Sequence, residues 1–385
     1  MFKKTLLALA TLGAFTGSAV AADVQLYGVL DQGFAYKKAD TTVGNDKTKD
    51  HSFEQVSGYN APSRFGLVGS EDLGNGLKLG FKLENSFNGD DGTLGQGGRL
   101  FGRESSVTVY GDFGAVSVGR MGGVASSAGT YDLVYATADA FDGGDNAVLG
   151  LTASSRYDNV VTYQSPKFTG VQATVQYSFK GNNVEDSSLA YDPATGREGS
   201  AATDRYASFA LTGDFGPLQA VTAFELQDYA SNNGKTGAEF VSYGEPRTGK
   251  AFYLGGNYNL GVAKLFVLTQ YFQDQKGLTY LDAKDATAEM GFKGYGLHVG
   301  TQFAALAGNV TAGLYYVDAT AENKTVADRD TDYVGTSVRY TYALSKRTTL
   351  YTGAGYAQAT VDATKTAAKV EKNVTQVYAG LTHTF

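Results

Sequence analysis

Polar and apolar residues alternate along almost all of the chain after residue 22. In GLKLGFKLENSF, Leu79 and Phe81 face one side of an extended chain, whereas Lys78 and Lys82 face the other. The same period of two continues in VQATVQY at 171–177 and in many later segments. This is the spacing of a β-strand with two different faces, so the sequence predicts an all-β fold.

Sixteen alternating segments are predicted, and the connections between them alternate in length. The segments begin near Asp23, Ser63, Gly76, Arg99, Gly114, Arg156, Gly170, Thr203, Pro217, Lys250, Val262, Gly291, Ala307, Thr331, Arg347 and Asn373. The short connections are 73–76, 111–114, 165–170, 213–217, 259–262, 304–308 and 343–347. An even number of strands, with short turns on one side and long loops on the other, is typical of an outer-membrane β-barrel.

A closed barrel also removes the edges of the sheet. An open sheet in lipid leaves unpaired backbone groups, each of which costs several kcal/mol, and a wide barrel lets the polar face meet water. The alternative is a soluble β-sandwich, but one domain of that class rarely reaches sixteen strands. We therefore predict a transmembrane 16-stranded antiparallel β-barrel.

The N-terminus has the pattern of a secretory signal peptide. A basic start, MFKK, precedes an apolar run over 6–20, and the small residues at 19–21 fit a cleavage site. We expect residues 1–22 to be removed and 23–385 to form the barrel domain. The alternative is a buried N-terminal helix. No other stretch is long and apolar enough to predict a transmembrane helix.

Composition narrows the class further. The chain has no Cys, so we expect a hydrogen-bonded sheet rather than disulfides to hold an exported protein together. It has 50 Gly, 26 Tyr and 22 Phe but only 5 Pro, which suits many strands joined by tight turns. Without the two lysines of the signal peptide, 30 basic and 39 acidic residues give a formal net charge of −9. Such a charge argues against nucleic acid as a partner.

One connection, from Met121 to Ser155, differs from the others. It has about 35 residues, against roughly 2–5 for a usual hairpin loop, and loops of such length are usually functional or disordered. It contains no Lys or Arg, and its acidic residues are Asp132, Asp139, Asp142 and Asp145. We predict that it folds inward across the bore of the barrel and sets what passes.

The chain resembles the trimeric general porins of Gram-negative bacteria, most closely the neisserial and beta-proteobacterial branch. The motifs that carry the resemblance span the mature chain. They are DVQLYGVLDQGF at 23–34, SRFGLVGSEDLGNGLKLGFKLENSF at 63–87, FGRESSVTVYGDFGAVSVGR at 101–120, SRYDNVVTYQSPKFTGVQATVQY at 155–177 and a terminal VYAGLTHTF. The resemblance implies an outer-membrane location, a homotrimer and a third loop folded into the pore. It also implies insertion by the outer-membrane assembly machinery, which recognises the terminal Phe385.

The resemblance further implies that acids of the third loop face basic residues of the barrel wall. The candidates for the wall are Arg64, Lys82, Arg103, Arg120 and Arg156. The period of two places Arg64 and Lys82 on the inner face, and Arg156 together with Asp158 opposite Tyr157 and Val161. Each charge could instead be an ordinary solvated lumen or loop residue.

Arg103 and Arg120 do not follow the alternation. Arg103 has the parity of Val107, and Arg120 has that of Val116 and Val118. A bulge or bend must turn them if they face the lumen, and bulges are common at barrel rims. The alternative is a position at the rim, outside the hydrocarbon band.

Opposed charges across a narrow pore predict a transverse field that sets ion preference. The sequence favours a weak preference for cations if Arg103 and Arg120 lie at the rim, and for anions if all five bases line the narrowest section. The expected function is passive diffusion of ions and small hydrophilic solutes. The alternatives are a solute-specific channel, a barrel enzyme such as a lipase, or an adhesin or anchor that uses the long loops.

No cofactor or metal is predicted. His51, His298 and His383 share no motif, and the acidic stretch DRDTD at 328–332 lacks the Gly and Glu of an EF-hand; a solvated loop is the better interpretation. The expected partners are a second and third copy of the chain, outer-membrane lipid and lipopolysaccharide, the assembly machinery, and diffusing solutes.

Overall fold

The computed structural model describes residues 24–145, 148–149, 151, 155–181, 204–228, 248–275, 277–278, 281–282, 291–322, 327–365 and 367–385. The predicted signal peptide lies outside the described residues. Within the described part of the chain, no helix is long and apolar enough to cross a membrane.

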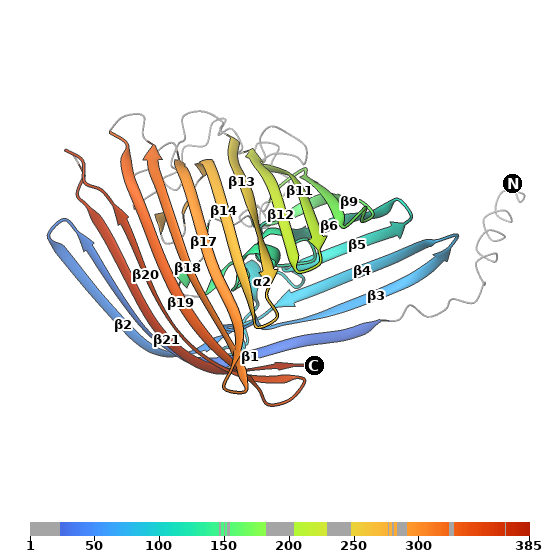
Figure 1. Ribbon diagram of the computed structural model, residues 1–385, viewed down its shortest axis with the longest axis horizontal. Coiled ribbons are helices and arrows are strands. Elements are labelled where there is room, and N and C mark those ends of the chain that lie inside the picture. The colour runs from blue at the N-terminus through green and yellow to red at the C-terminus, as the bar shows by residue number, and fades with distance from the viewer. Residues whose placement is uncertain are drawn as a thin grey trace, which may run out of the picture.

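Long antiparallel strands make up most of the molecule (Figure 1). The long strands are β1 (Gln25–Val43), β2 (Asp46–Ser57), β3 (Arg64–Gly74), β4 (Leu77–Ser86), β5 (Glu104–Gly111), β6 (Gly114–Gly122), β9 (Arg156–Gln164), β10 (Val171–Ser178), β11 (Arg205–Phe215), β12 (Leu218–Asp228), β13 (Thr248–Asn259), β14 (Ala263–Gln275), β17 (Gly291–Ala305), β18 (Gly308–Glu322), β19 (Arg329–Ala343), β20 (Thr348–Val361) and β21 (Val370–Thr384). The short elements are α2 (Gly95–Gly98), α3 (Val134–Ala138), β7 (Gly144–Asp145), β8 (Val148–Leu149), β15 (Gly277–Leu278) and β16 (Leu281–Asp282).

The sheet closes on itself where β1 pairs with β21, the blue and red ends of the chain in Figure 1. The other edge of β1 pairs with β2 along its later half and with β3 along its first residues. Because β2 and β3 follow one another along one edge, the 17 described strands of the sheet occupy sixteen positions of an antiparallel barrel. Phe385 completes the seam, exchanging two backbone hydrogen bonds with Gly28.

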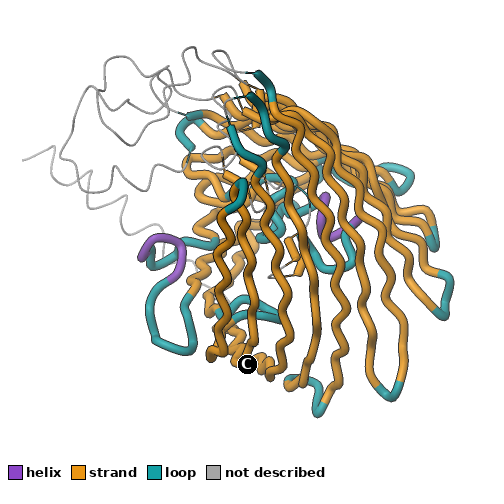
Figure 2. The backbone as a smooth tube through the Cα atoms, turned by 90° about the vertical axis from the view of Figure 1, so that its left-hand side faces the viewer, coloured by secondary structure: helices purple, strands orange, loops and turns teal. Residues whose placement is uncertain are grey.

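The predicted period of two is confirmed along the strands. On β14, Val267 is 48% exposed on the outer face, whereas its neighbour Leu268 is fully buried on the inner face. On β17, Val299 is exposed outward and His298 is buried inward. The seven predicted short connections lie between consecutive strands, and Figure 2 shows several of these turns in teal at one end of the strands.

Two segments predicted as loops are strands. β2 was not predicted, because DKTKDHSFEQ alternates between polar residues of different charge and has no apolar face. The acidic stretch at 328–332 is the beginning of β19 rather than a solvated loop. There, Arg329 is buried and donates to the carbonyls of Asp362 and Ala368.

The largest apolar cluster lies inside the barrel, between the long connection after β6 and the inner face of β11–β20. Val134, Tyr135 and Ala138 of α3 are fully buried, and α3 contacts β12, β13 and β14. The connection approaches the wall closely where the wall has glycine. A Cβ at Gly255 would lie 2.7 Å from the methyl group of Ala138, and one at Gly300 would lie 2.5 Å from that of Ala140. The described part of this connection therefore packs on the inner wall, as predicted.

Candidate functional site

Hydrogen bonds fix the loop between β6 and β9 to the far wall. Asn257 on β13 donates to the carbonyl of Thr137 (2.7 Å), and Gln302 on β17 donates to that of Ala140 (2.7 Å). The N–H of Ala140 donates to Nε2 of His298 (3.1 Å). Since Nε2 accepts, Nδ1 carries the proton of His298 and donates to the carbonyl of Leu314 (3.1 Å). The loop backbone is thus held at several points within a few residues of α3.

Two of the four loop acids are buried against this far wall. Asp139 accepts hydrogen bonds from the N–H of Phe141 (2.7 Å) and the hydroxyl of Tyr315 (2.8 Å). Burial raises the pKa of Asp139 to about 7. Asp145 is fully buried, pairs with Arg339 on β19, and accepts from Tyr378 on β21 (2.6 Å). Both carboxyls therefore anchor the loop.

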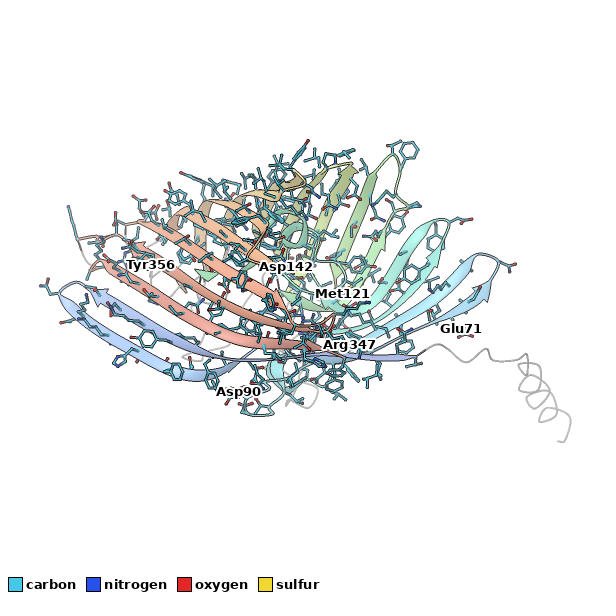
Figure 3. All side chains as sticks on the ribbon, turned by 60° about the horizontal axis from the view of Figure 1, so that its bottom comes forward. Glu71, Asp90, Met121, Asp142, Arg347 and Tyr356 are labelled. Carbon is cyan, nitrogen blue, oxygen red and sulfur yellow. The ribbon has the colours of Figure 1, made fainter. Side chains whose placement is uncertain are left out.

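The other two loop acids form a carboxyl pair, which we call the acid pair. Asp142 is exposed, with a positive φ of 57°, and Asp132 hydrogen bonds to it through its side chain. Burial, together with the adjacent Asp142, raises the pKa of Asp132, so the pair shares a proton. Asp142 also interacts electrostatically with Arg64 of the opposite wall. Figure 3 shows Asp142 within the ring of strands.

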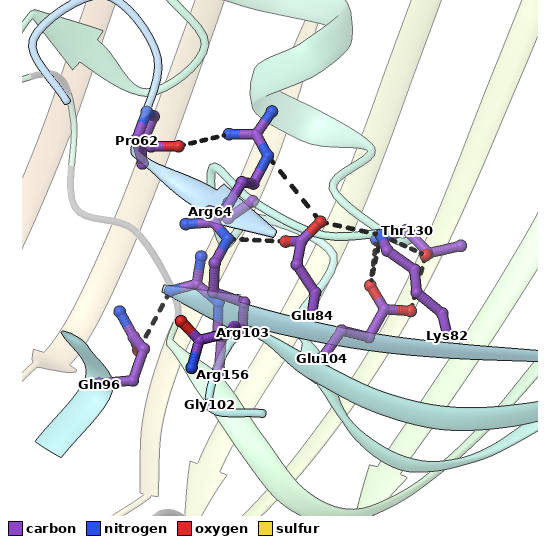
Figure 4. Close-up of polar contacts among 12 residues, drawn as sticks. Pro62, Arg64, Lys82, Glu84, Gln96, Gly102, Arg103, Glu104, Thr130 and Arg156 are labelled. Atoms are coloured by element: carbon purple, nitrogen blue, oxygen red, sulfur yellow. Dashed lines mark hydrogen bonds and ion pairs between the residues drawn. The ribbon is translucent and has the colours of Figure 1, made fainter. Parts of the chain in front are cut away.

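Glu84 on β4 organises the first part of the opposite wall (Figure 4). Its carboxylate accepts from Nε of Arg103 (2.6 Å) and from the hydroxyl of Tyr27 (2.7 Å). The side chains of Arg64 and Lys82 each come within 3.9 Å of it. Three cations therefore surround one carboxylate.

Glu104 joins this wall to the loop. Its carboxylate lies 2.9 Å from Nζ of Lys82, and the N–H and hydroxyl of Thr130 both donate to it (3.2 and 2.7 Å). Glu104 and Arg103 are adjacent in sequence, yet both are buried in these ion pairs. The chain therefore turns at the start of β5, so that Arg103 points to the same cluster as the inward-facing residues of β4.

Asp158 on β9 organises the second part of the wall. It accepts two hydrogen bonds from Arg99 (2.8 and 3.0 Å) and one from Arg120 (2.7 Å). The pairing of β6 with β9 is irregular here, and Asn159 has a positive φ of 54°. Gly119, with φ 135°, allows the same irregularity, since a Cβ there would lie 2.1 Å from the carbonyl oxygen of Ser105. This is the bulge that a lumen-facing Arg120 requires.

The same bulge makes the simple alternation predicted for 156–161 wrong. Tyr157 is buried and stacks on Tyr206, with ring centroids 4.0 Å apart. Arg156 lies beside the other guanidinium groups and donates to Gln96 at 3.4 Å. Its Nε is buried and has no hydrogen-bond partner among the described residues.

These side chains form what we call the basic wall: Arg64, Lys82, Arg99, Arg103, Arg120 and Arg156, with the carboxylates Glu84, Glu104 and Asp158 among them. The structure thus brings all five predicted bases to one side of the barrel, facing the acid pair. Six cations against three carboxylates leave the wall positive.

A second inward segment supports the loop from the side of β21. Residues 58–63, between β2 and β3, turn into the barrel, where Asp31 accepts from the N–H groups of Tyr59 (3.0 Å) and Ala61 (3.2 Å). The carbonyl of Tyr59 and the amide oxygen of Asn60 accept from Arg339 (3.3 Å each). Arg339 is therefore held in place to pair with Asp145.

Sequence reasoning missed several of these residues. Glu84 and Asp158 had inward parity and could have been counted with their neighbours, and Arg339 shares the inward parity of Ser337. Arg99 precedes a strand in an irregular segment, where alternation gives no signal. In the part of the chain that the structure describes, no group of three or more His, Asp or Glu side chains could hold a metal ion.

Comparisons with known proteins agree with this architecture. A family model described as Gram-negative porin matches residues 7–384. The chain is 32% identical to an outer membrane porin protein of Bordetella pertussis, over 92% of this chain and 94% of that protein. It is 33% identical to Outer membrane porin protein 32 of Delftia acidovorans, over 70% and 69%. Among solved structures, an anion-selective porin from Comamonas acidovorans is 26% identical, covers 95% of this chain and all of its own, and has a TM-score of 0.63.

Proposed function

This chain belongs to the Gram-negative porin family, and on that premise we propose that its channel prefers anions. The protein is an outer-membrane porin, a closed barrel through which ions and small hydrophilic solutes diffuse passively. The ion preference rests on the charges inside the barrel, which belong to the basic wall and the acid pair.

The observation that carries the proposal is the surplus of cations on the basic wall. Its three carboxylates offset only half of its six cations, and the acid pair shares a proton. Asp139 and Asp145 are turned away, into contacts with the far wall. Charges within a Debye length of about 8 Å act most strongly on a passing ion, so the local surplus outweighs the negative charge of the whole chain.

The grouping of Arg103 and Arg120 with the other bases also supports anions. The sequence favoured cations only with these two residues at the rim. The similar solved structure from Comamonas acidovorans is described as anion-selective. A positive wall opposite an acid pair makes a transverse field that orients dipolar solutes, while the net positive charge lowers the energy of an anion at this level.

Reversal potentials in a salt gradient test the proposal. The purified protein should form conducting steps in a planar bilayer, and a potassium chloride gradient should give a reversal potential with the sign of chloride. The opposite sign would contradict anion preference but leave the porin function intact. An absence of conducting steps would contradict the channel itself.

We also propose that the chain works as a homotrimer and has no enzymatic activity. A trimer form is described for a porin of Vibrio cholerae with the same type of barrel, although its 16% identity supports the fold alone. Native electrophoresis or mass measurement in detergent should give three copies, and a monomer alone would contradict this. The proposed partners in the membrane are lipid, lipopolysaccharide and the assembly machinery, and deletion of Phe385 should reduce insertion while export continues.

A further inference from the structure

The register of β2 sorts its charges onto two faces. Opposite residues of paired strands share a face, and β1 pairs Ala35 with Glu54 and Ala39 with Asp50. Ala35 is fully buried on the inner face, so the acids of β2 also have inward parity. The residues between them have outward parity: Lys47, Lys49, His51, Phe53 and Gln55. On this strand the bases therefore lie outside the barrel and the acids inside.

The outward side chains of the β1–β2 hairpin change from aromatic to basic along the strands. Phe34 and Phe53 stack with ring centroids 5.8 Å apart and are 54% and 71% exposed. One and two steps further toward the hairpin tip, Lys38 is opposite His51, and Lys49 and Lys47 follow. Exposed aromatic rings are typical of the lipid-facing band and its girdle, so the bases lie just beyond the hydrocarbon.

This basic face is at the long-loop end of the barrel. Arg347 belongs to a short turn between β19 and β20, and Tyr356 lies further along β20, toward its other end (Figure 3). Tyr356 has the outward parity of Thr375, which pairs with Lys38 across the seam. In an outer-membrane barrel the long loops are extracellular, so these bases lie at the level of the outer leaflet's headgroups.

We propose that the outward face formed by Lys38, Lys47, Lys49 and His51 binds the phosphorylated headgroup of an outer-leaflet glycolipid. Lysine binds phosphate as a point charge, and basic residues near a membrane surface attract anionic headgroups. Lys38 is 3.3 Å from Asp40, so part of its charge is already offset. Lys47 and Lys49 are exposed, and no ion pair engages them in the described part of the chain. These two lysines are the main determinants.

A second copy of the chain is the competing occupant. β18 and β19 carry the outward acids Asp318 and Asp332, which lie directly opposite each other, with Asp330 beside them. That acidic surface of a neighbour has the charge to meet a basic face. Phosphate is favoured because the basic face continues directly from exposed aromatic side chains, as a surface in contact with lipid does.

The test compares Lys47→Gln/Lys49→Gln with a matched control, Lys78→Gln/Lys346→Gln. The control removes the same charge from exposed residues at the short-turn end. Purified full-length protein in detergent is titrated with bisphosphorylated lipid A and with the same lipid after dephosphorylation. The wild type and the control should bind the phosphorylated lipid more tightly. The double variant should lose roughly fivefold in affinity for each lysine removed.

Two results would overturn the proposal. One is binding of phosphorylated lipid A by the double variant within about twofold of wild type, a change that corresponds to well under 1 kcal/mol. The other is loss of assembly on native electrophoresis with unchanged lipid binding, which would assign the face to contacts between copies. Bilayer conductance checks that each variant is folded. It also separates this proposal from the porin function, because the face lies outside the pore.

Discussion

Two guanidinium–carboxylate pairs lie inside this barrel, and they serve different purposes. Arg339 and Asp145 are enclosed by Tyr378, Ser337 and the 58–63 segment, and the Asp145 side chain has no exposed surface. Arg120 and Asp158 are in the basic wall, where the Asp158 side chain stays 21% exposed and also binds Arg99. One pair fixes the position of the loop, whereas the other adjusts the field in the lumen.

The difference lies in the surroundings of each pair. A buried pair is costly to break, since the charge that remains has neither water nor a partner. A pair within a surplus of like charges sets how much charge is left over, and water solvates what is released. The comparison therefore predicts stability effects on one side of the lumen and selectivity effects on the other.

The largest expected effect is on the buried pair. Arg339→Gln leaves Asp145 without its cation and removes the donor to Tyr59 and Asn60. We expect a loss of about 3–5 kcal/mol in the free energy of unfolding, the usual cost of an uncompensated buried charge. Denaturant titration measures it, and greater open-channel current noise would report the released loop. Arg339→Lys, which keeps the charge, is the control. A stability equal to wild type would show that the pair does not anchor the loop.

The second effect should separate selectivity from stability. Arg64→Gln with Arg156→Gln removes two charges of the basic wall, neither of which makes a close ion pair. The reversal potential should shift strongly toward cations, while the unfolding midpoint changes little. A matched control is Lys78→Gln with Lys346→Gln, which removes the same charge far from the wall. An unmoved reversal potential would show that the basic wall does not line the narrowest section.

Much of this architecture could be predicted from the sequence. The period of two placed Arg64 and Lys82 inward, because a strand between lipid and water must show a different face to each. It misplaced Tyr157, because one extra residue in a strand reverses every side chain beyond it and leaves no mark in composition. It missed β2 because a strand outside the hydrocarbon band needs no apolar face.

The roles of the loop acids could not be separated in the same way. Asp139 and Asp142 are three residues apart in an irregular loop, yet one is buried at Tyr315 and the other is exposed. Which acid faces the lumen depends on the positions of Asn257, His298 and Arg339 on strands far away in the sequence. Such pairings follow from barrel closure, which no local pattern encodes.

A smaller shift, in the opposite direction, is expected from the other half of the comparison. Asp158→Asn keeps the shape of the side chain but frees the charges of Arg99 and Arg120. Anion preference should therefore increase, with a shift smaller than that of the double arginine variant because one charge changes instead of two. Glu84→Gln should act in the same direction through Arg103. A shift toward cations in both variants would mean that these carboxylates position the arginines more than they offset them.

The smallest expected effect is the dependence on pH, and it arises from the anchored acid Asp139. Burial raises its pKa to about 7, so its carboxyl is mostly neutral below that pH and ionised above it. Lowering the pH through about 7 therefore removes negative charge from the lumen, and anion preference should rise. A proton taken up by His298, 3.7 Å away, would act in the same direction.

Two variants separate these groups. Reversal potentials measured between about pH 5 and about pH 9 span the relevant titrations. Asp139→Asn should flatten the change near pH 7, whereas His298→Gln should leave it. Because the folded loop favours the neutral carboxyl, the stability that Asp139 contributes is present below its unfolded pKa and is lost as the pH rises through about 7. Loop-dependent noise should therefore grow at high pH in the wild type and not in Asp139→Asn. The same growth in both would place the titrating group elsewhere, for example in the acid pair.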